Sequence, residues 1–155
     1  MSAIKKMVKK QAEVHGRERK SLMPIAQHLL KKEKFLSEEA MIAIADELNI
    51  STADVFGTVS FYTFMDTIPR GKYIIRVCKT IACHMKGKEE IINTLEDILK
   101  IKVGETTSDG KFSLLEANCL GWCHKGPVML INDDIYPEIS PKSVSDIINK
   151  YMKKK

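Results

Sequence analysis

The segment KYIIRVCKTIACH, residues 72–84, is a β-rich run that leads directly into two cysteines. A second segment, FSLLEANCLGWCH (residues 112–124), has the same arrangement. Cys78 and Cys83 form a C-x4-C step in the first segment, and Cys119 and Cys123 form a C-x3-C step in the second. These are the only four cysteines in the chain, and the 35 residues 84–118 separate the two pairs. Both loops must fold towards one point if the four thiols are to bind a single metal centre.

The sequence around the two cysteine segments alternates between strand and helix patterns. Residues 87–100 carry apolar side chains at three- and four-residue spacings, which is typical of a helix with one buried face. Ser140-Pro141 predicts the start of a last helix, because serine caps helices and proline suits the first turn. The predicted strands are Lys72–Val77, Ile101–Thr107, Phe112–Ala117, Val128–Asn132 and Ile135–Tyr136, with a hairpin turn at Ser108-Asp109-Gly110. This β-α-β-β-β-β-α order predicts a small α/β layer fold like that of thioredoxin.

Residues 1–70 have helical patterns instead. The segment SLMPIAQHLLKKEKF (residues 21–35) places its apolar side chains on one side of a helix, and Ser37 can cap the next helix. Pro69-Arg70-Gly71 then breaks the pattern. We therefore predict two domains: a helical bundle over residues 1–70 that docks a partner, and an α/β domain over residues 71–155.

The composition, 44% apolar and 29% charged, is that of a soluble globular protein. No apolar run approaches the roughly 18 residues that a membrane-spanning helix needs. The first residues, MSAIKKMVKKQAEVHGRERK, lack the apolar core of a secretory signal. We therefore expect a cytoplasmic protein with no direct membrane insertion, whose thiols stay reduced and do not pair as disulfides.

The net charge of +5 is concentrated in residues 1–20, which hold five Lys and two Arg against two Glu. A basic segment can bind nucleic acid. This one lacks interleaved aromatic residues, however, and no recognition motif follows it. We expect a solvated helical face or a surface that docks an acidic partner subunit, and no nucleic-acid partner.

Two cysteine pairs can hold more than one kind of centre. Four thiolates suit a 2Fe–2S cluster and also a structural zinc ion. Zinc knuckles usually use C-x2-C steps, which are shorter than the steps found here, and the C-x-x-C of a thioredoxin-type catalyst is absent. His84 and His124 lie directly beside a cysteine, so we interpret them as loop residues and not as ligands. The spacing favours the 2Fe–2S cluster and leaves zinc and inert or redox-sensing thiols as alternatives.

Two longer stretches carry a family resemblance. TVSFYTFMDTIPRGKYIIRVCKTIACHMKG (residues 58–87) and LLEANCLGWCHKGPVMLINDD (residues 114–134) closely resemble the small 2Fe–2S subunit of NADH-dehydrogenase modules. The resemblance covers about residues 20–152. It implies a thioredoxin-like ferredoxin domain behind an N-terminal helical bundle. The family serves respiratory complex I and also soluble NAD(P)-linked hydrogenases and formate dehydrogenases, including electron-bifurcating ones.

Matched position by position, the resemblance implies that Cys78, Cys83, Cys119 and Cys123 are the ligands of one 2Fe–2S cluster. The chain has no glycine-rich nucleotide loop and no P-loop, so we expect an electron-transfer subunit with no substrate site of its own. FMN and NAD(P) are then expected on a partner subunit that also carries iron–sulfur centres. A hydrogenase or formate dehydrogenase catalytic subunit is a further expected partner.

Two positions depart from the family pattern. Thr80 stands where many members have glycine, and His-Lys-Gly-Pro (residues 124–127) follows Cys123 where respiratory members more often have a short stretch ending Ala-Pro. These differences favour a soluble hydrogenase or formate dehydrogenase complex over respiratory NADH:quinone oxidoreductase. A structural zinc-binding module that bridges subunits is the alternative from another class.

Overall fold

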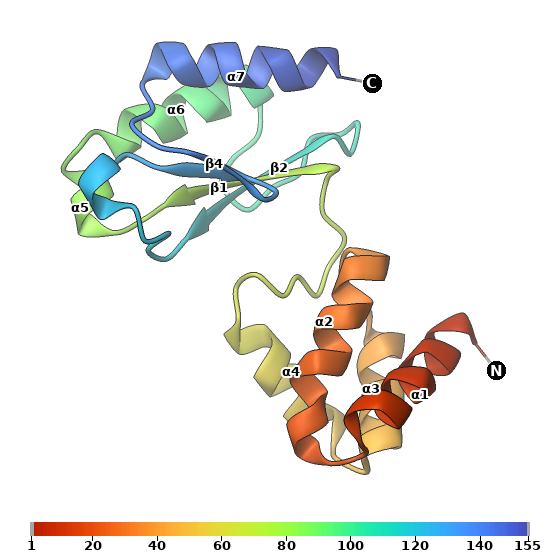
Figure 1. Cartoon of the computed structure of the whole chain (residues 1–155). Helices are drawn as coiled ribbons and strands as arrows, with labels where there is room; N and C mark the ends of the chain where they lie inside the picture. Colours follow the sequence, from red (N-terminus) through yellow and green to blue (C-terminus); the bar gives the residue numbers. More distant parts are fainter. Residues whose placement is uncertain (1, 155) are drawn as a thin grey trace. The chain divides into compact units, whose positions relative to one another are not determined.

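The computed structural model describes residues 2–154, and the chain divides into two compact units (Figure 1). The first unit ends at Pro69 and the second begins at Arg70. This division falls where Pro69-Arg70-Gly71 interrupts the helical pattern of the sequence. That the first unit docks a partner stays a prediction.

The first unit is entirely helical. Ser37 and Ser51 cap two of its helices, since each side chain accepts a hydrogen bond from a backbone N–H three residues later. Its core is apolar and is formed by the facing sides of all four α-helices, with Ile25, Leu29 and Ile44 fully buried. The elements are α1 (Ala3–His15), η1 (Arg19–Ser21), α2 (Leu22–Glu33), α3 (Glu38–Leu48) and α4 (Thr52–Phe61).

The second unit is a four-stranded sheet with helices, which confirms the α/β prediction. The sheet order is β2-β1-β3-β4; β1 runs parallel to β2 and antiparallel to β3, and β3 pairs antiparallel with β4. Helices α6 and α7 lie side by side on one face of the sheet (Figure 1). The elements are β1 (Tyr73–Cys78), α5 (Ile81–His84), α6 (Lys88–Leu99), β2 (Phe112–Ala117), η2 (Cys123–Lys125), β3 (Met129–Ile131), β4 (Asp134–Tyr136) and α7 (Pro141–Lys153).

The central strand β1 packs one of its faces against the helices. Its side chains Ile75 and Val77 are fully buried, and they pack with apolar residues of α6 and α7. Side chains two residues apart in a strand lie on the same face, so Ile75 and Val77 both face the helices. Gly71 lies just before β1, where an added Cβ would be 2.8 Å from the backbone carbonyl carbon of Phe112. Only glycine allows the two backbones to approach this closely.

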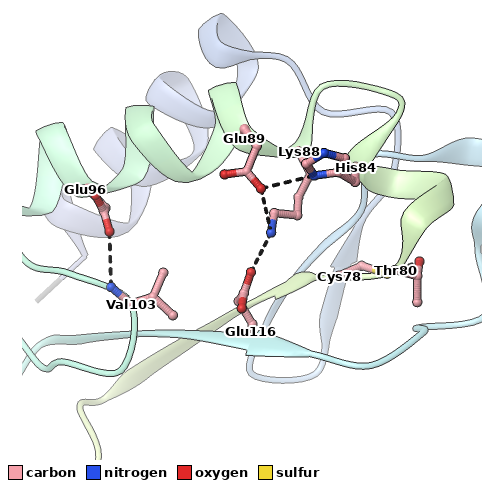
Figure 2. Close-up of polar contacts among 8 residues, drawn as sticks. All are labelled: Cys78, Thr80, His84, Lys88, Glu89, Glu96, Val103 and Glu116. Atoms are coloured by element: carbon pink, nitrogen blue, oxygen red, sulfur yellow. Dashed lines mark hydrogen bonds and ion pairs between the residues drawn. The ribbon is translucent and has the colours of Figure 1, made fainter.

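The predicted strand over Ile101–Thr107 is wrong. In that segment only Thr106 forms a bridge, an isolated antiparallel one with Ser113. The backbone N–H of Val103 donates to the carboxylate of Glu96 on α6 (Figure 2), and that of Lys102 donates to the side chain of Glu105. Carboxylates therefore take two N–H groups of this segment, while the N–H groups of Gly104 and Thr107 donate to the carbonyl oxygens of Leu114 and Phe112 on β2.

Within residues 2–154, no helix combines the length and the apolar character that crossing a membrane requires.

Candidate functional site

The first cysteine pair is built into the core of the second unit. Cys78 is the last residue of β1, and its N–H donates to the carbonyl oxygen of Val128 at 3.1 Å. Cys83 belongs to the short helix α5, which begins after Thr80. Both cysteines are buried, with 2% and 1% of their surface exposed. The strand end and the helix therefore fix the first pair as part of the folded scaffold.

The second cysteine pair lies in a loop and is exposed. Cys119 and Cys123 have their sulfur atoms 3.2 Å apart. Gly121 between them has a φ of +83° and donates its N–H to the sulfur of Cys119 at 3.4 Å. A left-handed glycine lets the loop turn back so that the two thiols face one another.

The fold brings the two loops to one edge of the sheet. Strands β1 and β2 are parallel neighbours, so the loops that follow their carboxyl ends emerge at the same edge. Leu120 and Trp122 of the second loop pack against the buried group formed by Cys78, Cys83 and Val128. The backbone N–H of Leu120 also donates to the sulfur of Cys78.

Gly126, three residues after Cys123, also lies close to the first cysteine pair. A Cβ at this position would lie 3.2 Å from the sulfur of Cys83. Within residues 2–154, no three His, Cys, Asp or Glu side chains are gathered tightly enough to hold a single metal ion. The four predicted site residues lie as two pairs, Cys78 beside Cys83 and Cys119 beside Cys123.

Hydrogen bonds and burial give the thiols different pKa values. Burial raises the pKa of Cys78, but the hydroxyl and N–H of Thr80 and the N–H of Leu120 outweigh it, so the pKa is lowered overall. Burial and the neighbouring Cys78 raise the pKa of Cys83. The hydrogen bond and the negative charge of Cys119 raise the pKa of Cys123. The backbone donors around Cys78 would equally stabilise a metal-bound thiolate.

Thr80 is a site residue whose role sequence reasoning missed. Its hydroxyl oxygen lies 3.2 Å from the sulfur of Cys78. In the sequence it is visible only as a departure from the family's glycine. The hydroxyl group supplies a hydrogen-bond donor that glycine does not have.

Two lysines after α5 reach the second cysteine segment, and sequence reasoning missed both. The Nζ of Lys86 donates to the carbonyl oxygens of Cys123 and His124, each at 3.2 Å. The Nζ of Lys88 lies 2.6 Å from Glu116 on β2 and 3.0 Å from Glu89, as Figure 2 shows. Burial acts to lower the pKa of Lys88, but its hydrogen bonds to the two carboxylates raise it overall.

The two histidines beside the cysteines are exposed and have other neighbours. His84 Nδ1 lies 3.2 Å from the carboxylate of Glu89 (Figure 2). The ring of His124 stacks on Trp122, with the ring centroids 5.9 Å apart. His84 is the last residue of α5 and His124 belongs to η2, so neither lies in an irregular loop; that they are not ligands stays a prediction.

The arrangement fits a 2Fe–2S cluster on chemical grounds. Such a cluster takes two thiolates on each of its two irons, and the four cysteines are presented as two pairs. Backbone N–H groups of Leu120 and Gly121 point at sulfur atoms, which is the kind of hydrogen bond that sets a cluster's potential. Gly126 leaves open the space beside Cys83.

Comparison with known proteins identifies one family and two of its relatives. The profile of the family described as "Thioredoxin-like [2Fe-2S] ferredoxin" matches residues 4–152. A subunit of the NADH-quinone oxidoreductase of Buchnera aphidicola subsp. Acyrthosiphon pisum (strain APS) is 42% identical over 121 residues, covering 78% of this chain and 75% of that protein. The "NADP-reducing hydrogenase subunit HndA" of Solidesulfovibrio fructosivorans is 36% identical over 117 residues, covering 76% of this chain and 68% of that protein.

A solved structure shares the fold. In the crystal structure of an NAD+-reducing [NiFe]-hydrogenase in the air-oxidized state, one chain superimposes with a TM-score of 0.75 at 21% sequence identity. The match covers 89% of this chain and 24% of that chain, so this protein spans about a quarter of the longer one. At this identity the likeness concerns the fold alone.

Proposed function

We propose a function from the premise that the chain belongs to the thioredoxin-like 2Fe–2S ferredoxin family: it is an electron-transfer subunit of a multi-subunit, NAD(P)H-linked oxidoreductase. The observation that carries the proposal is the convergence of two cysteine pairs at the carboxyl ends of the parallel strands β1 and β2. When bound, a 2Fe–2S cluster supplies one-electron redox chemistry. The chain's own residues hold the cluster, shield it and donate hydrogen bonds to its ligands.

The ligands in this proposal are Cys78, Cys83, Cys119 and Cys123. They are the only cysteines in the chain, and they reach one edge of the sheet as two pairs. Four thiolates make the oxidised site negatively charged, at roughly −2, and this charge tends to lower the reduction potential, whereas hydrogen bonds to sulfur raise it. Thr80, Leu120 and Gly121 provide such hydrogen bonds.

The partner in this proposal carries FMN and the NAD(P) site. A one-electron centre needs a flavin or a similar cofactor to exchange electrons with a two-electron donor such as NAD(P)H. The relatives at 42% and 36% identity are both subunits of larger oxidoreductases, which supports an assembly with other chains. On α4 and just after it, Phe56, Phe61 and Phe64 are exposed, and exposed apolar side chains of this size often mark a protein contact. We expect the assembly in the cytoplasm, where cysteine ligands stay reduced.

Two kinds of parent complex are supported by relatives. The hydrogenase relative from Solidesulfovibrio supports a soluble NAD(P)-linked hydrogenase or a related formate dehydrogenase, and the NADH-quinone oxidoreductase relative from Buchnera supports a respiratory complex. Affinity purification from the native host under anaerobic, low-salt conditions distinguishes them. A co-purifying hydrogenase or formate dehydrogenase chain indicates the first, and membrane-embedded quinone-module chains indicate the second.

The cofactor is tested by metal and acid-labile sulfide analysis of anaerobically purified protein. We expect about two irons and two sulfides per chain, and a spin-one-half EPR signal after one-electron reduction. Zinc in stoichiometric amount without sulfide would contradict the proposal and support the structural zinc module. The isolated chain should also show no NADH oxidation with an artificial electron acceptor, because the flavin is expected on another subunit.

A further inference from the structure

Lys86 and Lys88 follow the first cysteine pair, and both extend to the segment that carries the second pair. Lys86 donates to the backbone of Cys123 and His124, at the end of the C-x3-C step. Lys88 pairs with Glu116, three residues before Cys119. The two lysines therefore contact the second cysteine segment on both sides of its ligand pair.

The two contacts differ in burial. The side chain of Lys88 is only 9% exposed, and its ion pair joins the first turn of α6 to β2. Lys86 is exposed, and its two acceptors are neutral carbonyl groups. Its aliphatic chain also passes close to Gly126, where an added Cβ would lie 3.4 Å from Lys86 Cδ. Lys86 thus lies against the turn that closes the second loop.

The charges of the two contacts differ as well. Residues 79–88 and 117–127 contain no Asp or Glu. Lys88 is neutralised by Glu116 and Glu89, whereas the contacts of Lys86 in the described chain include no carboxylate. Lys86 therefore supplies a positive charge that nearby carboxylates do not cancel, next to thiolates that carry negative charge.

We propose that Lys86 and Lys88 are positioning residues that hold the second cysteine pair against the first, and that Lys86 also raises the reduction potential of the site. This inference rests on the proposed function, because it assumes that the four cysteines hold a 2Fe–2S cluster. Glu116 takes part in the same positioning, since it is the carboxylate that Lys88 binds on β2.

The test uses the full chain with four substitutions: Lys86→Met, Lys86→Arg, Glu116→Gln and the control Lys150→Met. Lys150 is an exposed lysine of α7, away from both cysteine segments in the sequence. Glu116→Gln weakens the Lys88 contact and leaves Lys88 paired with Glu89, so the variant does not bury an unpaired charge. Each reconstituted protein is challenged with an iron chelator, and its midpoint potential is measured by an EPR-monitored redox titration.

We expect Lys86→Met and Glu116→Gln to lose the cluster roughly tenfold faster than the wild type, because the partners that orient metal ligands typically contribute 10- to 100-fold. Lys86→Met should lower the midpoint potential, since it removes a positive charge, and Glu116→Gln should raise it, since it removes a negative charge. Lys86→Arg should restore most of the wild-type behaviour, and Lys150→Met should match the wild type. A merely structural role would not move the potential in opposite directions.

A second measurement separates this inference from the proposed function. Hydrogen exchange in the cluster-free protein should show faster exchange of the amides in residues 118–125 for Lys86→Met than for Lys150→Met. A wild type that binds iron and sulfide, with Lys86→Met equal to it in cluster loss, potential and exchange, would overturn the positioning role alone. A wild type without iron and sulfide would instead overturn the proposed function.

Discussion

The two cysteine pairs of this protein are held in different ways. Cys78 and Cys83 are buried at a strand end and in a short helix, whereas Cys119 and Cys123 are exposed on a loop. The first pair is part of the core and is fixed by the fold. The second pair depends on contacts that come from outside its own loop, among them those of Lys86. If the four cysteines are the ligands, as proposed, one pair is buried in the fold and the other is exposed and contacted by Lys86.

The largest effect is expected when a cysteine of either pair is replaced, because the cluster is then lost. Replacing Cys78 or Cys119 with Ala should abolish cluster binding, because one of the two irons then lacks one of its two protein ligands. The stability of the cluster-free protein should separate the pairs. We expect a cost of about 1 kcal/mol or more for Cys78→Ala, which leaves a gap in the core, and less than about 0.5 kcal/mol for the exposed Cys119→Ala. Iron analysis and urea unfolding measure the two effects, and equal unfolding costs would contradict the contrast.

Thiol labelling of the cluster-free protein sharpens the same comparison. Cys119 and Cys123 are exposed, so an alkylating reagent should modify them directly. The buried Cys78 and Cys83 should react only after local opening, at least about 100-fold more slowly. Mass spectrometry of peptides over a time course gives the rates. Similar rates for all four thiols would mean that the first pair is not fixed by the fold.

A smaller effect on cluster retention is expected at Gly126, which follows the second cysteine pair and lies close to Cys83 of the first. A Cβ there would lie 3.2 Å from the sulfur of Cys83, so Gly126→Ala should displace that sulfur and increase the rate of cluster loss by roughly tenfold. Gly57→Ala in α4 is the matched control, because an added Cβ meets nothing within 4 Å there. That control should leave the cluster unchanged and stabilise the protein by about 0.5–1 kcal/mol. Equal cluster loss in the two variants would remove the steric argument.

The smallest effect is expected at the histidines. His84 contacts Glu89 and His124 stacks on Trp122, so neither ring is committed to a cysteine sulfur. His84→Ala and His124→Ala should therefore keep their iron and sulfide near the wild-type amount. Loss of the cluster in either variant would show that one pair is completed by a histidine.

Much of the fold could be predicted because local patterns and the final structure agree. The apolar run before Cys78 predicts a strand, the three- and four-residue spacing of residues 87–100 predicts α6, and Ser140-Pro141 predicts the start of α7. The segment Ile101–Thr107 has similar strand signals, but contacts with Glu96 and Glu105 decide its structure. Those contacts join residues only three and seven positions apart, but they form because of the loop geometry after α6, which the pattern of apolar residues does not specify.

The candidate site divides in the same way. The four cysteines are visible in the sequence, because they are few and paired, and their assignment as ligands remains a prediction. Their convergence depends on the parallel pairing of β1 with β2, which the sequence suggests only through the strand-helix-strand order. Lys86 and Lys88 are long, flexible side chains whose acceptors lie 37 and 28 residues further along the chain. Only the folded structure shows that Lys86 meets the backbone of Cys123 and that Lys88 meets Glu116 on β2.

The place of β1 in the sheet also sets the order of events during synthesis. Both of its neighbours, β2 and β3, come later in the chain. At typical rates of roughly 5–20 residues per second, the 35 residues between the pairs take about two to seven seconds to emerge from the ribosome. During that interval Cys78 and Cys83 are present without the other half of the site. On the proposed ligand assignment, a cluster that needs all four cysteines can form only after Cys123 has emerged and β2 can pair with β1.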